Sequence, residues 1–269
     1  MKICVCGKGG SGKSTVVALL AAELQRRGKR VLVVDSDESN AGLYWMLGLD
    51  EPPNPLMELA GGKKSIQRVL RTGFTEDADD REKSVLARDE FRTDELPDAY
   101  VQWADGVGLV CIGKIHQALE GCACPMGVLS REFLKKVRTD DDEVVVVDME
   151  AGVEHFGRGV ETSVDAVMVV AEPSLESVTL AERIKALASQ AGARFAGAVL
   201  NKVSSEKIGA QLREALERRG VQALSAIPFR QEFLLGGLEG KALNVEPVAD
   251  EVRSFVDSIL AVAEAPKGN

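Results

Sequence analysis

The chain of 269 residues carries 33 Lys and Arg against 42 Asp and Glu, a formal net charge of −9 at pH 7. That balance argues against a nucleic-acid binder, whose electrostatic footprint is basic. With 45% hydrophobic and 28% charged residues, the composition excludes a disordered or collagen-like protein. No signal-peptide layout or apolar run of about 18 residues is found, and the five cysteines are an odd number. We therefore expect a cytoplasmic protein with reduced thiols and no membrane partner.

Short β-branched runs alternate with amphipathic stretches along the chain. The predicted strands are Lys2–Cys6, Arg30–Asp35, Val107–Ile112, Glu143–Asp148, Ala166–Ala171, Phe195–Leu200 and Gln222–Ile227. The predicted helices are Lys13–Arg27, Gly127–Val137, Leu175–Ala191, Glu206–Arg219 and Val248–Ala263. Several strands are apolar throughout, as a strand covered by helices on both faces must be. This order predicts an α/β fold with a doubly wound, mostly parallel sheet flanked by helices.

The segment 51–104 interrupts this alternation because it contains no convincing apolar strand. Within it, residues 76–95 hold nine acidic and four basic side chains. Such a charge run predicts an exposed, salt-bridged helix or a mobile insertion, and less strongly a docking site for a partner. We expect one domain over residues 1–269 with a charged insertion near 51–104.

The first predicted strand leads directly into a glycine-rich loop that is followed by a helix. The loop is Gly7-Lys8-Gly9-Gly10-Ser11-Gly12-Lys13-Ser14-Thr15. It matches the P-loop pattern G-x-x-x-x-G-K-[ST] in the strand–loop–helix context that supports it. Glycines let backbone N–H groups turn toward a phosphate, and the helix start adds partial positive charge. We expect Lys13 to reach the β- and γ-phosphates of a nucleotide and Ser14 to ligate Mg²⁺; a glycine-rich turn without a ligand is the weaker alternative.

Two Cys-x-Cys pairs occur in the chain, and their settings differ. Cys122 and Cys124 lie in a Gly- and Pro-flanked loop before a predicted helix, whose positive end would favour thiolates. Two sulfurs are too few for a tetrahedral metal site, and a twofold dimer would supply the other two. Two ordinary loop cysteines remain the alternative. Cys4 and Cys6 alternate along a buried strand, so we expect core packing for both and also for Cys111.

Lys8 makes the loop read K-G-G-x-x-K-[ST], which resembles the deviant Walker A ATPases that include MinD, ParA and the nitrogenase iron protein. The resemblance implies a P-loop NTPase fold and an ATP-dependent homodimer in which Lys8 reaches the partner's nucleotide phosphates, as an arginine finger does. It makes Asp37 the carboxylate that positions the attacking water. It also places Asp35 and Asp148 near Mg²⁺ through bound waters. For either aspartate after the second strand, a helix cap is the plain alternative.

Two further loops resemble the adenine-binding loops of these ATPases. Asn201-Lys202 ends one predicted strand, where relatives use the asparagine amide to bind the base. Pro228-Phe229 resembles the second loop beside the base, although Arg230 stands near where relatives often carry an acidic residue. The turn Met149–Gly152 after the fourth strand is suited to a switch that senses the γ-phosphate.

The cysteine loop together with Asp148-Met-Glu-Ala-Gly-Val-Glu-His155-Phe-Gly-Arg158-Gly resembles the CooC-type nickel-insertion ATPases, accessory proteins of carbon monoxide dehydrogenase. This resemblance covers Met1 to about Ala263. It implies Ni²⁺ bound by Cys122 and Cys124 of both protomers, and Zn²⁺ would suit these thiolates equally. The implied client is carbon monoxide dehydrogenase, with acetyl-CoA synthase as the sister possibility. We interpret His155 as a switch residue and His116 as an alternative metal ligand.

Two other functions stay open on the sequence. One is an ATP-dependent iron–sulfur electron carrier of the nitrogenase iron protein type, although such carriers take their two cysteines from separate loops. The other is a MinD- or ParA-like positioning ATPase that acts on membrane or DNA. The acidic total and the absence of a basic apolar face on the last predicted helix argue against it.

Overall fold

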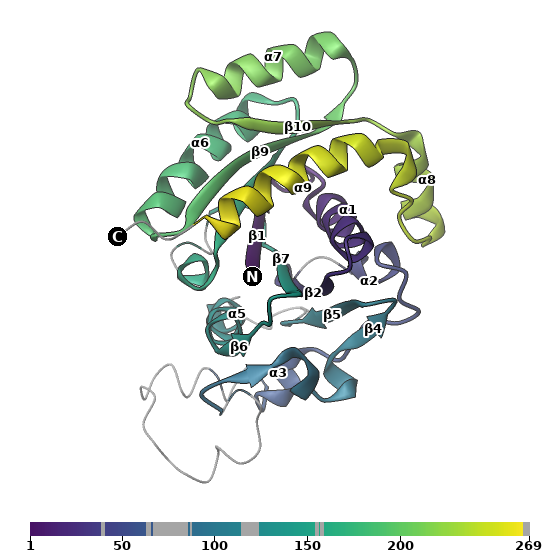
Figure 1. Cartoon of the computed structure of the whole chain (residues 1–269), viewed down its shortest axis with the longest axis vertical. Helices are drawn as coiled ribbons and strands as arrows, with labels where there is room; N and C mark the ends of the chain where they lie inside the picture. Colours follow the sequence, from purple (N-terminus) through teal and green to yellow (C-terminus); the bar gives the residue numbers. More distant parts are fainter. Residues whose placement is uncertain are drawn as a thin grey trace.

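A twisted sheet of eight strands forms the centre of the computed structural model (Figure 1). Seven strands run parallel: β1 (Lys2–Gly7), β2 (Arg30–Asp35), β5 (Val107–Cys111), β7 (Glu143–Asp148), β8 (Ala166–Ala171), β9 (Arg194–Val203) and β10 (Ala223–Pro228). The eighth, β4 (Gln102–Ala104), is antiparallel to β5 at one edge, which gives the order β10-β9-β8-β1-β7-β2-β5-β4. The predicted doubly wound, mostly parallel sheet is confirmed. The structure describes residues 1–38, 41–62, 66, 86, 88–113, 124–153, 156 and 159–265, without the side chains of Cys124, Val160 and Glu161.

Helices cover both faces of the sheet (Figure 1). One face is covered by α1 (Lys13–Arg26), α2 (Leu43–Met46), α8 (Gln231–Glu239) and α9 (Ala249–Glu264). The other face carries α3 (Leu56–Leu59), α5 (Cys124–Lys136), α6 (Leu175–Gln190) and α7 (Glu206–Glu217). The single-turn helices are η3 (Thr93–Glu95), η4 (Asp98–Tyr100), η6 (Val160–Ser163) and η7 (Glu246–Val248). Among the described residues, no helix is long and apolar enough to span a bilayer.

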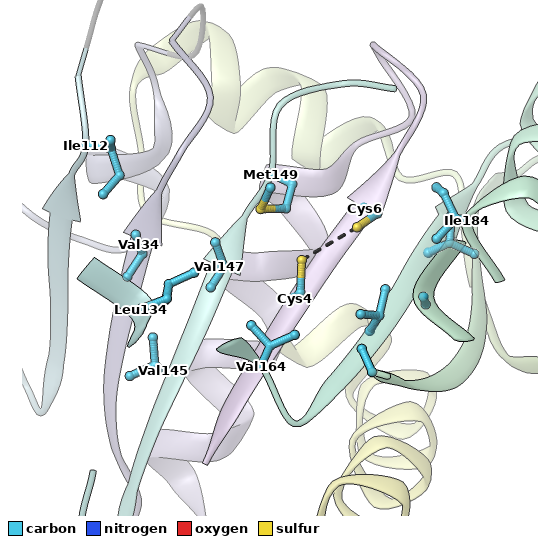
Figure 2. Close-up of a cluster of buried hydrophobic side chains, with 14 of the residues drawn as sticks. Cys4, Cys6, Val34, Ile112, Leu134, Val145, Val147, Met149, Val164 and Ile184 are labelled. Atoms are coloured by element: carbon cyan, nitrogen blue, oxygen red, sulfur yellow. Dashed lines mark hydrogen bonds between the residues drawn. The ribbon is translucent and has the colours of Figure 1, made fainter. Parts of the chain in front are cut away.

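Two hydrophobic clusters, one on each side of the sheet, hold the helices in place. Alternate side chains of β1 enter different clusters, so Cys4 and Cys6 point to the same side (Figure 2). Their sulfur atoms lie 3.6 Å apart among buried apolar side chains such as Val147 and Met149. Cys111 is buried in the other cluster. The prediction that these three cysteines pack in the core is confirmed.

The segment 51–104 differs from its prediction. Its described part adds the edge strand β4, and Phe91 is buried in the short strand β3 (Phe91–Arg92), which pairs with β6 (Val137–Arg138). The segment thus contains strands, but they are too short to give an apolar run, so the sequence pattern does not reveal them. Residues 91–95 form a strand and a 3-10 turn and residues 88–90 form no helix, in place of the predicted charged helix, while 76–85 and 87 lie outside the described residues.

Candidate functional site

The glycine-rich loop lies across the carboxyl end of the sheet, between β1 and α1. Gly7 has φ 155° and Gly12 has φ 90°. A Cβ at Gly7 would lie 2.7 Å from the Val170 carbonyl oxygen, and one at Gly12 would lie 2.3 Å from Nδ2 of Asn201. Glycine at both positions therefore lets the loop approach β8 and β9 so closely. The loop thus presents the N-terminus of α1, with its unpaired N–H groups and partial positive charge, at one edge of the sheet.

Three acidic residues, Asp35, Asp37 and Asp148, gather near the ends of β2 and β7, where Asp148 contacts Ser14. The strands pair in register at Asp35 and Asp148, and the Ser14 hydroxyl donates to Oδ2 of Asp148 over 2.6 Å. The Asp37 backbone N–H donates to Oδ1 of Asp35 over 3.1 Å. Burial, and next the charge of Asp35, raise the pKa of Asp148 to about 7. A hydroxyl and buried carboxylates are the hard oxygen ligands that Mg²⁺ prefers, so these residues fit a magnesium ion.

The turn after β7 lies against the glycine-rich loop, as the predicted switch requires. The Gly152 N–H donates to the Gly7 carbonyl over 3.2 Å, and Met149 N–H donates to the Val5 carbonyl over 3.2 Å. The Ala151 Cβ lies 3.6 Å from where a Cβ on Gly9 would stand. A movement of the loop around a phosphate would therefore be transmitted to this turn through contact.

The two predicted base-binding loops lie side by side next to the glycine-rich loop. Asn201 Nδ2 donates to the Ser11 carbonyl over 2.9 Å, and Lys202, whose φ is 58°, donates from Nζ to the Gly10 carbonyl. The Phe229 N–H donates to the Val203 carbonyl over 2.9 Å, which joins the second loop to the first. Pro228 ends β10 at the same edge. The structure brings these residues together, while adenine binding by them stays a prediction.

Lys8 points to two glutamates that the sequence analysis missed. Its Nζ lies 3.3 Å from Oε1 of Glu172, which directly follows β8, and 2.7 Å from Oε2 of Glu176 on α6. These carboxylates raise the pKa of Lys8, with Glu176 contributing most, and Lys8 in turn lowers the pKa of Glu176. The sequence indicates only that these acids, which follow a predicted parallel strand, lie at the same edge of the sheet as the P-loop; it does not indicate that they reach Lys8.

A pocket of about 320 Å³ opens beside the loop. It lies between Thr15 on α1, Trp45 on α2 and the helix α8, and Phe233 of α8 lines one wall. The α8 residues Leu234, Leu235 and Leu238 are exposed to solvent. Neither α2 nor α8 was predicted, because α2 is one turn long and the Gly236-Gly237 pair weakens the helix pattern of α8.

The predicted metal ligands lie at the margin of the described structure. Cys122, His116 and His155 are outside the described residues, and Cys124 is described only as the first residue of α5. Within the described ranges, no cluster of three or more His, Cys, Asp and Glu side chains suited to a metal ion is found. A hydrogen bond connects α5 to the nucleotide site: the Ser36 hydroxyl donates to the Ser130 hydroxyl over 3.0 Å.

A doubly wound sheet with a P-loop at its first strand and paired aspartates beside it defines a nucleotide-binding protein of the P-loop class. Residues 3–243 match the family model of the CobQ/CobB/MinD/ParA nucleotide-binding domain, and the chain belongs to this family of P-loop proteins that bind and hydrolyse ATP.

Relatives and solved structures agree with this assignment. An uncharacterized ATP-binding protein of Methanocaldococcus jannaschii is 41% identical over 96% of this chain and 98% of its own length. The carbon monoxide dehydrogenase accessory protein CooC of Rhodospirillum rubrum is 36% identical over 76% of this chain and 75% of its own. The fold is that of the septum site-determining protein MinD from Pyrococcus horikoshii, solved with Mg-ADP, with a TM-score of 0.68 and 19% identity over 100% of this chain and 98% of that one.

Proposed function

We propose that the protein is a homodimeric ATPase that binds nickel between its two protomers and delivers it to a nickel enzyme, with carbon monoxide dehydrogenase as the client. The proposal rests on one juxtaposition. The helix that begins at Cys124 is hydrogen-bonded, through Ser130, to the residue that stands between Asp35 and Asp37 of the nucleotide site. The CooC relative supports the choice of metal and client.

Residues of one chain would bind ATP, Mg²⁺ and the attacking water. The glycine-rich loop would hold the ATP phosphates, with Lys13 at the β- and γ-phosphates. Ser14 and Asp148 would hold Mg²⁺, which neutralises charge on the phosphates when bound. Asp37 would orient the attacking water, since its backbone is fixed by the hydrogen bond to Asp35. The remaining cation is Lys8 of the second protomer, brought in only when the dimer closes on ATP.

The cysteine pair provides half of a metal site. Two thiolates from each protomer would give the four soft ligands of a tetrahedral site on the twofold axis. The N-terminus of α5 stabilises thiolates because the helix carries partial positive charge there. Nickel is cargo in this scheme, held while ATP is bound and released to the client afterwards.

Hydrolysis would change nickel affinity through the connection between the two sites. ATP and its loss alter the environment of Asp35 and Asp37, and Ser36 lies between them with its hydroxyl on Ser130 of α5. A ligand shifts an equilibrium only by its different affinities for two states. Here the two states would differ in α5. In one state, with ATP bound, the Ser36–Ser130 hydrogen bond holds α5 against the nucleotide site, and in the other α5 is released from that site.

The deciding experiment measures nickel, iron and labile sulfide in anaerobically purified protein, before and after incubation with Ni²⁺. We expect about one nickel per two chains, absent from the Cys122→Ala/Cys124→Ala variant, with ATP hydrolysis retained in both. The Cys4→Ala variant is the matched control, because Cys4 has the same neighbour spacing but is buried in the core and should leave nickel content unchanged.

Three results would contradict the proposal. Full nickel binding by the double cysteine variant would place the metal elsewhere. Stoichiometric iron and sulfide would move the protein to the iron–sulfur electron carriers. A protein that binds no cysteine-dependent metal but sediments with lipid vesicles or DNA would belong with the positioning ATPases.

A further inference from the structure

The lysine that the proposed dimer needs at the partner's nucleotide is held within its own protomer. Glu172 and Glu176 both contact its Nζ, at 3.3 and 2.7 Å. The Lys8 side chain is only 34% exposed although it belongs to a surface loop, and Glu172 is 20% exposed. A lysine that reaches across a dimer interface must first leave these two carboxylates.

Hydrogen bonds fix the turn between β8 and α6 that carries both glutamates. The Ser174 hydroxyl accepts the Ser177 N–H over 3.2 Å and caps α6, while the Ser177 hydroxyl accepts the Glu172 N–H over 3.1 Å. Glu176 lies in the first turn of α6. The backbone that carries the two glutamates is therefore fixed by the start of α6.

Glu172 also binds a second cation of the same site. Lys202 Nζ lies 3.6 Å from Oε2 of Glu172 and donates to the Gly10 carbonyl of the loop. One carboxylate thus bridges Lys8 and Lys202 across the glycine-rich loop. Because nucleotide phosphates would bind the same two lysines, the phosphates and these carboxylates would compete for Lys8 and Lys202.

We infer that Glu172 and Glu176 form an acidic clasp that holds Lys8 in its own protomer and so sets how much ATP is needed to close the dimer. The inference rests on the proposed function, since it assumes that Lys8 acts across the interface. The clasp keeps the chain monomeric at low ATP because breaking two ion pairs opposes dimer closure. ATP lowers this cost, because Lys202 exchanges Glu172 for the phosphate at its own loop and Lys8 exchanges both glutamates for the phosphate of the partner's nucleotide.

The size of the effect follows from the exposure of the pairs. Glu176 is 77% exposed, so the Lys8–Glu176 pair lies in the range of surface ion pairs. Removing the Glu176 charge should therefore change a binding equilibrium by about two- to fivefold, and more at low ionic strength. The Glu172→Gln/Glu176→Gln variant should give at least the effect of the single substitution.

Two measurements test the clasp. The first is the acylation rate of Lys8 by an amine-reactive ester in the nucleotide-free chain, followed by peptide mass spectrometry. We expect Glu176→Gln to speed this reaction about two- to fivefold, since the Lys8 amine loses an ion pair. The second is the ATP concentration at which half of the protein sediments as a dimer, measured on an Asp37→Ala background to prevent hydrolysis. We expect this concentration to fall by a similar factor.

Glu206→Gln is the matched control. Glu206 lies in the first turn of α7 next to the capping residue Ser205, so its substitution removes a helix-terminal acid in the same way without touching Lys8. It should change neither readout. Equal Lys8 acylation in the wild-type chain and in the double glutamine variant would overturn the clasp, as would a dimer that needs more ATP when the glutamates are removed. A wild-type chain that stays monomeric at saturating ATP would instead refute the proposed dimer, and the acylation rates alone would then decide whether the clasp exists.

Discussion

Helices α1 and α5 both follow strands of the same parallel sheet, but they cover opposite faces and begin very different sites. The loop before α1 is surrounded by residues from four strands of its own chain: Asp35 from β2, Asp148 from β7, Glu172 after β8 and Asn201 on β9. The predicted metal site before and at the start of α5 has only the two thiols of Cys122 and Cys124 in sequence, too few for a tetrahedral site. A phosphate site can thus be built within one doubly wound chain, because the strand ends converge there.

In the proposed function, this difference is the reason for a dimer. The proposed metal site has half its ligands in each protomer, and the proposed catalytic site has all but Lys8. Closing the dimer would complete both at once, so nucleotide and nickel would stabilise the same assembled state. That shared requirement gives the chain a coupling between the two sites even where they do not touch.

The largest expected effect comes from completing or breaking the catalytic site. Lys8→Ala and Asp37→Ala should each lower ATP hydrolysis by about 10³-fold or more, because one removes the cation and the other the carboxylate at the transition state. An equimolar mixture of the two variants should recover about a quarter of the wild-type rate, since half of the dimers are mixed and one of their two sites is intact. Steady-state phosphate release measures both.

Complementation separates action across the interface from action within one chain. If Lys8 served its own nucleotide, each mixed dimer would lack Lys8 at one site and Asp37 at the other, and the mixture would stay inactive. Far-UV circular dichroism and the thermal midpoint of each variant serve as controls for folding. Full activity in either single variant would remove that residue from the catalytic assignment.

An effect of intermediate size is expected at Asp148, because its buried negative charge lowers the free energy of unfolding. Its pKa is raised from 3.8 to about 7, so the folded chain binds a proton that the unfolded chain has already lost between these pH values. Stability should therefore fall as pH rises through this window, and the cost is fully present above pH 7. Asp148→Asn should gain about 2–3 kcal/mol relative to the wild type between pH 5 and pH 8.5, measured by urea unfolding of the nucleotide-free protein.

Asp257→Asn provides the comparison for a surface carboxylate. Asp257 forms an exposed ion pair with Arg27 at 2.6 Å, so losing it should cost at most about 1 kcal/mol and should not stabilise the protein. Parallel stability profiles for Asp148→Asn and the wild type over this pH range would show that Asp148 is not protonated in the folded chain. Asp148→Asn should also hydrolyse ATP poorly. The buried carboxylate that lowers the stability of the folded chain is the one that we propose holds Mg²⁺.

Most strands of the sheet and the phosphate loop can be predicted from the sequence, because the local residue pattern there matches the structure that the fold imposes. The strand Glu143–Asp148 is predicted with its observed bounds, since a short run of β-branched apolar residues between polar ends favours a strand covered on both faces. The start of α1 at Lys13 was predicted as well. The clasp was not, because Glu172 and Glu176 look like ordinary helix-terminal acids until β8 is placed beside β1. Contacts between strand ends that are distant in sequence depend on strand order, which periodicity does not reveal.

The smallest expected effect concerns the contact between the two sites, and it tests whether they communicate within one protomer. Ser130→Ala removes the partner of the Ser36 hydroxyl and should leave nickel binding and basal hydrolysis in place. It should reduce the ratio of nickel affinities with and without ATP by about two- to tenfold, the worth of one hydrogen bond. Competition with a chromophoric chelator measures both affinities.

Ser189→Ala, which removes a hydroxyl bonded to the Lys185 carbonyl on the surface of α6, is the control. An unchanged ratio in Ser130→Ala would show that the Ser36–Ser130 contact does not carry the coupling, and dimer closure would then be the link to test next.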